Sequence, residues 1–200
     1  MPYALGQIVH GLVISTELID IQHQHLAYLT DFQGEIGQYI EVILIAKSHA
    51  QWIVSCQTLM STRSVSRLLQ LHQANLPIWA KTLQWLADGV KVQVEAISVF
   101  IPLRHVTPKP SSTFVVKVIS VSPLRLSYTC ALVEQWANQT KILVVKVIES
   151  HCCQGDIEGV KSILLNADLS KIHKGDQLPV QFLYFDNEQA CAYVNLQEQT

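Results

Sequence analysis

The amino-acid sequence predicts an all-β protein of three small five-stranded barrels in tandem, joined by short helical connectors. Its apolar residues come in short β-branched runs, all far too short to span a bilayer. Several runs alternate, as in residues 91–95 (KVQVE), where the valines face one way and the polar side chains the other. Many short strands at regular spacing are typical of small barrels rather than of a parallel sheet.

The predicted strands fall into three groups along the chain. They are residues 6–14, 38–45 and 51–55; then 78–86, 90–94, 99–102, 114–121 and 124–129; then 142–148, 155–157, 162–165, 177–185 and 190–196. We therefore place the barrels at residues 4–60, 76–130 and 141–197, with connectors at 61–75 and 131–140.

Two segments between these groups have a helical pattern. In residues 62–74 the side chains of Val65, Leu68, Leu69 and His72 fall at helical spacing and form one face. Residues 131–137 (ALVEQWA) fit two helical turns, with Leu132 and Trp136 on one side. Because each segment follows one strand group and precedes the next, we expect each to connect two barrels.

An internal repeat supports this division. The segments 18–21, 91–94 and 155–158 occupy the same place in each group, and the run that follows closes near Phe32, His105 or Leu169. Ile21, Val94 and Ile157 stand 73 and 63 residues apart, a separation that suits one barrel with its linker.

Charge is unevenly distributed along the chain. The formal net charge is −2, which argues against binding of nucleic acid through bulk positive charge. Residues 1–75, 76–130 and 131–200 carry −2, +4 and −4, so only the middle third attracts phosphate. The sequence shows no signal peptide and no membrane-inserting segment, and its five cysteines fit free thiols in a reducing compartment. We expect a cytoplasmic protein.

The middle repeat contains a run that resembles a known family. In residues 88–106, Phe100, Ile101, Pro102 and His105 match the run Gly-Phe-(Ile/Leu)-Pro-x-Ser-His of ribosomal protein S-one. The connector at 131–134, the segment from Glu158 to Leu169 and the hairpin from Lys174 to Leu196 are similar to the same family. The chain thus resembles the three-repeat cyanobacterial and chloroplast form. This implies three OB-fold barrels of the S-one type, single-stranded RNA or the ribosome as partner, and a location in the cytoplasm or plastid stroma.

The chain also departs from the family pattern. The third repeat has Gln154 in place of an aromatic residue and Asn166 in place of the histidine, and Arg104 replaces the serine of the middle repeat. The family has basic residues after the fifth strand, but here the first repeat continues with Cys56 and Gln57 and the middle one with residues 128–130 (YTC). These departures predict weakened RNA binding, centred on the middle barrel.

Binding of single-stranded RNA by such a barrel requires aromatic faces for stacking and cations along the backbone track. The middle repeat offers both, and its predicted RNA-binding residues are Trp85, Lys91, Phe100, Arg104 and His105. Alternatively, Phe100 and Trp85 belong to the core and the charges form a solvated face.

Other candidate sites are weaker. Tyr28 and Phe32 occupy the matching place in the first repeat, but Asp20, Asp31 and Glu35 surround them. His23 and His25 could share one face of a strand, yet no third metal ligand has suitable spacing.

We expect no metal and no cofactor. Cys152 and Cys153 are expected to be incidental thiols. Because no phosphate loop or nucleophile motif occurs, we expect neither catalysis nor a small-molecule substrate.

Two functions remain open. In one, the chain is an RNA-binding or ribosome-associated protein of the S-one type. In the other, it is a non-catalytic adaptor that has lost RNA binding and docks a protein partner on its apolar strands. We favour the first, because basic residues remain where the aromatic residue remains.

Overall fold

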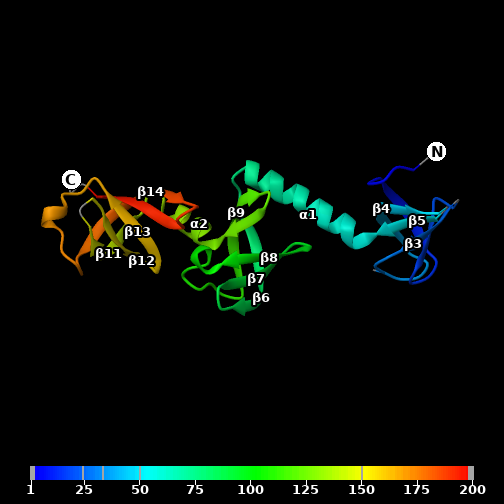
Figure 1. Cartoon of the computed structure of the whole chain (residues 1–200), viewed down its shortest axis with the longest axis horizontal. Helices are drawn as coiled ribbons and strands as arrows, with labels where there is room; N and C mark the ends of the chain where they lie inside the picture. The colour runs from blue at the N-terminus through cyan, green and yellow to red at the C-terminus, as the bar shows by residue number, and fades with distance from the viewer. Residues whose placement is uncertain (1–2, 24, 33, 50, 150, 198–200) are drawn as a thin grey trace. The chain divides into compact units, whose positions relative to one another are not determined.

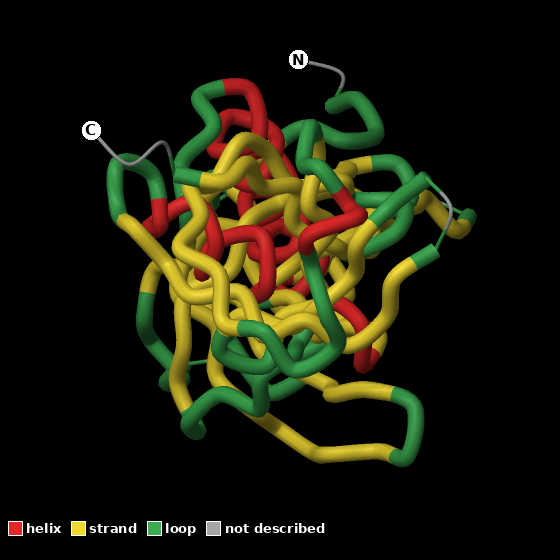
Figure 2. The backbone as a smooth tube through the Cα atoms, turned by 90° about the vertical axis from the view of Figure 1, so that its left-hand side faces the viewer, coloured by secondary structure: helices red, strands yellow, loops and turns green. Residues whose placement is uncertain are grey.

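The computed structural model describes residues 3–23, 25–32, 34–49, 51–149 and 151–197. It is an all-β protein of three five-stranded barrels, two closed and one nearly closed, with few helices (Figure 1). Strands make up most of the backbone (Figure 2). The prediction of three tandem OB-fold barrels is confirmed. The chain divides into two compact units, and their boundary falls between Arg67 and Leu68. Within the described ranges, no helix is both long and apolar enough to cross a membrane.

The first barrel belongs to the first unit. Its strands are β1 (Ile8–Val13), β2 (Leu18–Ile21), β3 (His25–Leu29), β4 (Tyr39–Ser48) and β5 (Gln51–Ser55). They close in the order β1-β2-β3-β5-β4, and β3 pairs with β5 in parallel. Alternate residues fill the interior, among them Val9, Ile19, Ile21, Leu29, Val42, Leu44 and Val54.

Helix α1 (Cys56–Gln73) begins directly where β5 ends, earlier than the sequence pattern indicated. Asp31 explains the early start, because its carboxylate accepts hydrogen bonds from the backbone N–H groups of Cys56 and Gln57, at 2.8 and 2.6 Å. Ser55 adds a second cap, since its hydroxyl accepts a hydrogen bond from Thr58 N at 2.8 Å. These are the donors that a helix N-terminus leaves without partners.

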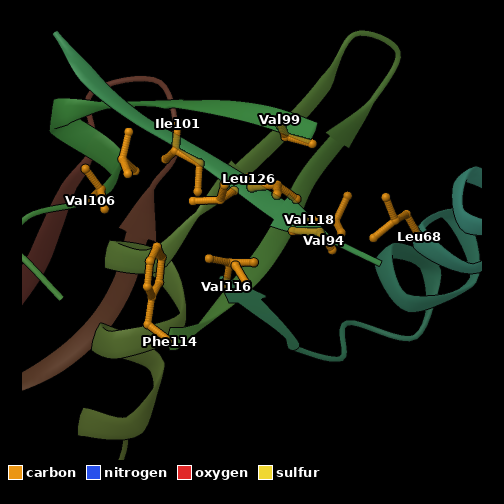
Figure 3. Packing of buried hydrophobic residues seen from close by; sticks show 12 residues of the cluster. Leu68, Val94, Val99, Ile101, Val106, Phe114, Val116, Val118 and Leu126 are labelled. Atoms are coloured by element: carbon orange, nitrogen blue, oxygen red, sulfur yellow. The ribbon is translucent and has the colours of Figure 1, made fainter. Parts of the chain in front are cut away.

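The middle barrel begins the second unit. Its elements are β6 (Ile78–Leu86), β7 (Gly89–Val94), β8 (Ile97–Pro102), the short 3₁₀ helix η1 (Leu103–His105), β9 (Thr113–Val121) and β10 (Leu124–Ser127). The core contains side chains from each strand and Leu68 from α1 (Figure 3). The alternation of β7 is as predicted: Val90, Val92 and Val94 are fully buried and Lys91 is exposed.

The middle barrel differs from the other two at one seam. Its strands run in the order β10-β9-β6-β7-β8, and within the described chain no ladder joins β8 to β10. Instead, side chains bridge one end of the seam. His105 Nδ1 and Ser127 Oγ are hydrogen-bonded at 3.3 Å, and Thr129 Oγ1 donates to Thr107 O at 2.9 Å.

A second connector leads to the third barrel. Helix α2 (Tyr128–Val133) is capped by Ser127, whose hydroxyl accepts a hydrogen bond from Cys130 N, and η2 (Glu134–Trp136) follows. Trp136 is buried in the core of the third barrel, and Leu132 is partly buried against that core.

The third barrel is closed in the same order as the first. Its elements are β11 (Thr140–Ile148), β12 (Cys153–Ile157), β13 (Val160–Leu165), η3 (Leu169–Lys171), β14 (Gln177–Asp186) and β15 (Cys191–Leu196). Here too the third and fifth strands, β13 and β15, pair in parallel.

Candidate nucleic-acid interface

Phe100 and Lys91 lie side by side on the outer face of the middle barrel. They are directly paired across β7 and β8, and side chains opposite one another on antiparallel strands share a face. Val99 and Ile101, the neighbours of Phe100 along β8, point into the core, so the ring is directed outward and is 40 % exposed. An exposed ring beside an ammonium group suits a nucleotide, which has a flat base and a charged phosphate.

Gly89 fixes the position of this ring. A Cβ atom at residue 89 would lie 2.6 Å from Phe100 Cζ and 2.2 Å from the carbonyl oxygen of Ile101. The Phe100 ring therefore lies across the bare backbone of the glycine, and the outer side of the ring stays free.

A pocket of about 210 Å³ opens between β8 with η1 on one side and β10 on the other. It lies at the seam of the barrel, and its lining combines an aromatic ring, two guanidinium groups and an imidazole. The lining residues are Phe100, Pro102, Arg104, His105, Arg125 and Leu126. Guanidinium groups can bind phosphate with two parallel hydrogen bonds.

Arg125 was not among the residues that we predicted from the sequence. It belongs to β10, and its nearest acidic partner is Glu188, at 4.0 Å, with both side chains largely exposed. A pair of this kind is weak, so the guanidinium group is available to a ligand. The sequence does contain a signal for Arg125: it is a basic residue in the predicted fifth strand of the middle repeat, whose net charge is positive.

His105 is buried at the base of the pocket, with 4 % exposure. Burial lowers its pKa below the ordinary histidine value, and the charges of Arg104 and Arg125 lower it further. The ring is therefore neutral at pH 7, and its bond to Ser127 ties the end of β8 to the cap of α2. His105 lines the site and also holds the local structure.

In the first barrel too, a side chain that follows the third strand is hydrogen-bonded to the serine that caps the next helix, but this side chain is an aspartate instead of a histidine. There Asp31, just after β3, accepts a hydrogen bond at 2.8 Å from Ser55 Oγ, and Ser55 caps the helix that follows β5. Asp31 and His105 thus occupy equivalent positions in their repeats.

Trp85 lies apart from the pocket. Its partner across the β6–β7 ladder is the buried Val90, and its ring packs partly against the core. Lys109 Nζ lies 4.7 Å from the centre of the indole. The structure therefore groups Lys91 with Phe100, and Phe100 with Arg104 and His105, while Trp85 occupies a separate position.

The described residues of the other two barrels arrange their aromatic rings differently, with Lys47 Nζ 4.9 Å from the Trp52 ring in the first and Lys141 Nζ 5.5 Å from the buried Trp136 ring beside the third. Tyr28 and Phe32 are exposed in the first barrel, and Tyr28 lines an open groove of about 740 Å³ with Leu26, Ser48, His49, Gln51 and Ile53. That lining contains no lysine or arginine. In the third barrel, Tyr184 and Tyr193 stack on one another at 4.6 Å.

The other candidate sites are also placed. His23 Nε2 is hydrogen-bonded to the Tyr39 hydroxyl at 2.6 Å, and its Nδ1 lies 3.6 Å from Asp20. Across the described residues, no group of three or more His, Cys, Asp or Glu side chains could hold a metal ion. Cys153 is fully buried, which raises the pKa of its thiol, and Cys152 is partly exposed.

Electrostatics distinguish the middle barrel from the first. The five middle strands contain four cationic side chains and no acidic one, whereas β2 and β4 of the first barrel contain Asp20 and Glu41. One of the four, Lys117, is buried in an ion pair with Glu134. Lys81, Lys91 and Arg125 remain for a ligand.

Fold and site together define a tandem of three OB-fold barrels with a cationic and aromatic face on the middle one. No family model and no curated protein matches the chain. Among solved structures, the chain is similar to a multidomain protein with nucleic acid binding domains from Streptococcus pneumoniae TIGR4. The identity is 12 %, the alignment covers 98 % of this chain and 75 % of that one, and the TM-score is 0.27. So loose a superposition does not bear on function.

Proposed function

We propose that this protein binds single-stranded RNA through its middle barrel, as a ribosome-associated or messenger-associated protein of the S-one type. The proposed role is binding without catalysis. One observation carries the proposal: Phe100 presents a free ring between the cations of Lys91 on one side and Arg104 and Arg125 on the other. This is the arrangement that stacks a base and holds the adjoining phosphates.

The proposal predicts a specific effect of truncating the aromatic ring. Phe100→Ala should weaken binding of a single-stranded oligoribonucleotide by about 1–3 kcal/mol, the contribution of one stacked base. Fluorescence anisotropy at low salt measures this loss. Tyr184→Ala is the matched control, because that ring is 50 % exposed on another barrel; it should leave the affinity unchanged.

The cations predict a salt effect. Wild-type binding should weaken as salt rises, because phosphate contacts release counterions. The double variant Lys91→Ala/Arg104→Ala should show a flatter dependence, by about 1.4 in the logarithmic slope for two single-strand phosphate contacts. The proposal is wrong if the wild type binds no RNA at low salt, or if Phe100→Ala and Tyr184→Ala behave alike.

A second function, that of a protein-binding adaptor, has its own supporting observation. On the outer side of β11, Ile142 and Val144 are 48 and 40 % exposed, and Leu26 and Tyr28 line the uncharged groove of the first barrel. Exposed apolar side chains gathered on strands are typical of docking surfaces. A pull-down from nuclease-treated lysate at high salt tests this function: a retained partner supports the adaptor, and its loss with nuclease supports RNA.

A further inference from the structure

Trp79 is the most exposed of the large apolar side chains in the described chain, at 66 %. It lies on β6 between Ile78 and Ala80, both of which pack in or against the core of the middle barrel. Because side chains alternate along a strand, the indole is directed to the outer side of the sheet. Val115, its partner on β9, is partly buried beside it.

Strand register places Trp79 on the same face as Phe100. Lys81 follows Trp79 by two residues and is paired with Gln93 on β7. Lys91 precedes Gln93 by two residues and is paired with Phe100 on β8. Since paired side chains share a face, the outer surface of β6, β7 and β8 presents Trp79, Lys81, Lys91 and Phe100 together.

The three strands that form this face carry charge of one sign, and the exposed Glu95 lies in the turn after β7. The strands β6, β7 and β8 contain Lys81 and Lys91 and no aspartate or glutamate. The face is therefore complementary to a polyanion, and its two rings supply the flat surfaces that bases need.

The two rings are too far apart for one base to contact both. They lie two strands apart, about 10 Å across the sheet, and four residues apart along the strand direction, which adds about 13 Å. Lys81 and Lys91 lie between them. The order ring, ammonium, ammonium, ring fits a strand of several nucleotides, with a base stacked at each end and phosphates in the middle.

We propose that Trp79 is a second base-stacking platform and Lys81 a phosphate contact, so that the single-stranded RNA track runs from Phe100 across β7 to β6. This inference rests on the proposed RNA-binding function, which it extends in length and in the number of bases held. A protein partner covering Trp79 is the competing outcome.

The test uses the full chain and oligouridylates of two lengths, about four and about twelve nucleotides, which lie at the short end and in the longer part of the range of OB-barrel site sizes. Trp79→Ala should bind the short oligonucleotide like the wild type and the long one at least about fivefold more weakly. Lys81→Ala should reduce the salt slope for the long oligonucleotide by about 0.7, the value for one single-strand phosphate.

The matched control is Leu83→Ala. Leu83 is also an exposed apolar residue of β6, at 49 %, and it is the extra residue at the irregularity in the β6–β7 ladder. Its truncation should leave the affinity for both oligonucleotides unchanged. Trp79→Phe should retain binding but lose the fluorescence change that RNA produces in the indole of the wild type.

The outcomes separate the inference from the function on which it rests. If Trp79→Ala binds the long oligonucleotide as tightly as the wild type while Phe100→Ala is impaired, the second platform is refuted and the first site stands. If the wild type binds neither oligonucleotide, the proposed function itself fails. Retention of a protein by the wild type but not by Trp79→Ala, with equal RNA affinity, assigns the indole to that protein.

Discussion

His105 illustrates how a single residue can line a site and also hold it together. The imidazole lies at the base of the pocket, and its bond to Ser127 reaches across the seam between β8 and β10. It therefore cannot present its face to a base as freely as Phe100 does. Under the proposed function, its role would be to position β8, and through β8 the Phe100 ring.

The lowered pKa of His105 predicts a pH dependence of stability. Above about pH 6.5 the ring is neutral in both folded and unfolded chains, and its contribution is fully present. As the pH falls through the folded-state pKa, the unfolded chain binds its proton first, so stability is lost. Thermal unfolding at pH 7.5 and pH 5 should show this loss for the wild type, and a smaller loss for His105→Gln.

The control for this prediction is His173→Gln. The His173 side chain is 80 % exposed, so its replacement should leave the acid-induced loss as large as in the wild type. An equal loss in wild type and His105→Gln would show that other groups govern the acid response.

At the scale of the element, strand β6 shows why one tryptophan was predicted at the site and the other was missed. Strict alternation would put Trp79, Lys81, Leu83 and Trp85 on one face. The ladder with β7 is irregular between Thr82 and Gln84, so Leu83 is an extra residue and the pattern reverses. As a result Trp85, which follows the irregularity, packs against the core, whereas Trp79, which precedes it, faces outward.

Helix α1 depends on a residue far from it in the sequence. Removing the Asp31 carboxylate removes the acceptor for Cys56 N, Gln57 N and Ser55 Oγ. Asp31→Ala should lower the free energy of unfolding by about 1–2 kcal/mol, the usual effect of losing a helix cap. Urea unfolding followed by circular dichroism measures the change.

Two comparisons make this result specific. Glu35→Ala removes an exposed carboxylate of the first barrel and should be neutral, whereas the Asp31 carboxylate is partly buried; Asp31→Asn keeps an acceptor and should lose less than Asp31→Ala. If Asp31→Ala and Glu35→Ala unfold at the same urea concentration, the cap does not stabilise the helix.

At the scale of the whole molecule, the architecture could be predicted from the sequence, because alternation, turn residues and the repeat are local signals. Alternation also placed Lys91 on the outer face of a regular strand, whereas Phe100 was identified from the run that resembles the S-one family. The features that could not be predicted depend on contacts between residues that are far apart in the sequence. The start of α1 depends on Asp31, and the burial of His105 depends on Ser127, 22 residues away.

Charge segregation is the other property of the whole chain that matters for function. Although the net charge of the chain is −2, all the charged side chains in the strands of the middle barrel are cationic. Under the proposed function, an RNA strand would be attracted to the middle barrel and repelled by the acidic segments that flank it in the sequence.

The open seam of the middle barrel has a dynamic consequence. The first and third barrels are closed by backbone ladders, β3 with β5 and β13 with β15. In the part of the chain that the structure describes, no ladder joins β8 to β10, and the His105–Ser127 hydrogen bond bridges one end of their seam. Local opening should therefore be easiest there, and hydrogen–deuterium exchange should be faster in β10 than in β5 or β15. Local opening of the β8–β10 seam would widen the pocket that Arg104 and Arg125 line. RNA bound in this pocket should oppose that opening and so slow hydrogen–deuterium exchange in β10. Equal protection of β5, β10 and β15 from exchange would show that the missing β8–β10 ladder does not make the middle barrel easier to open.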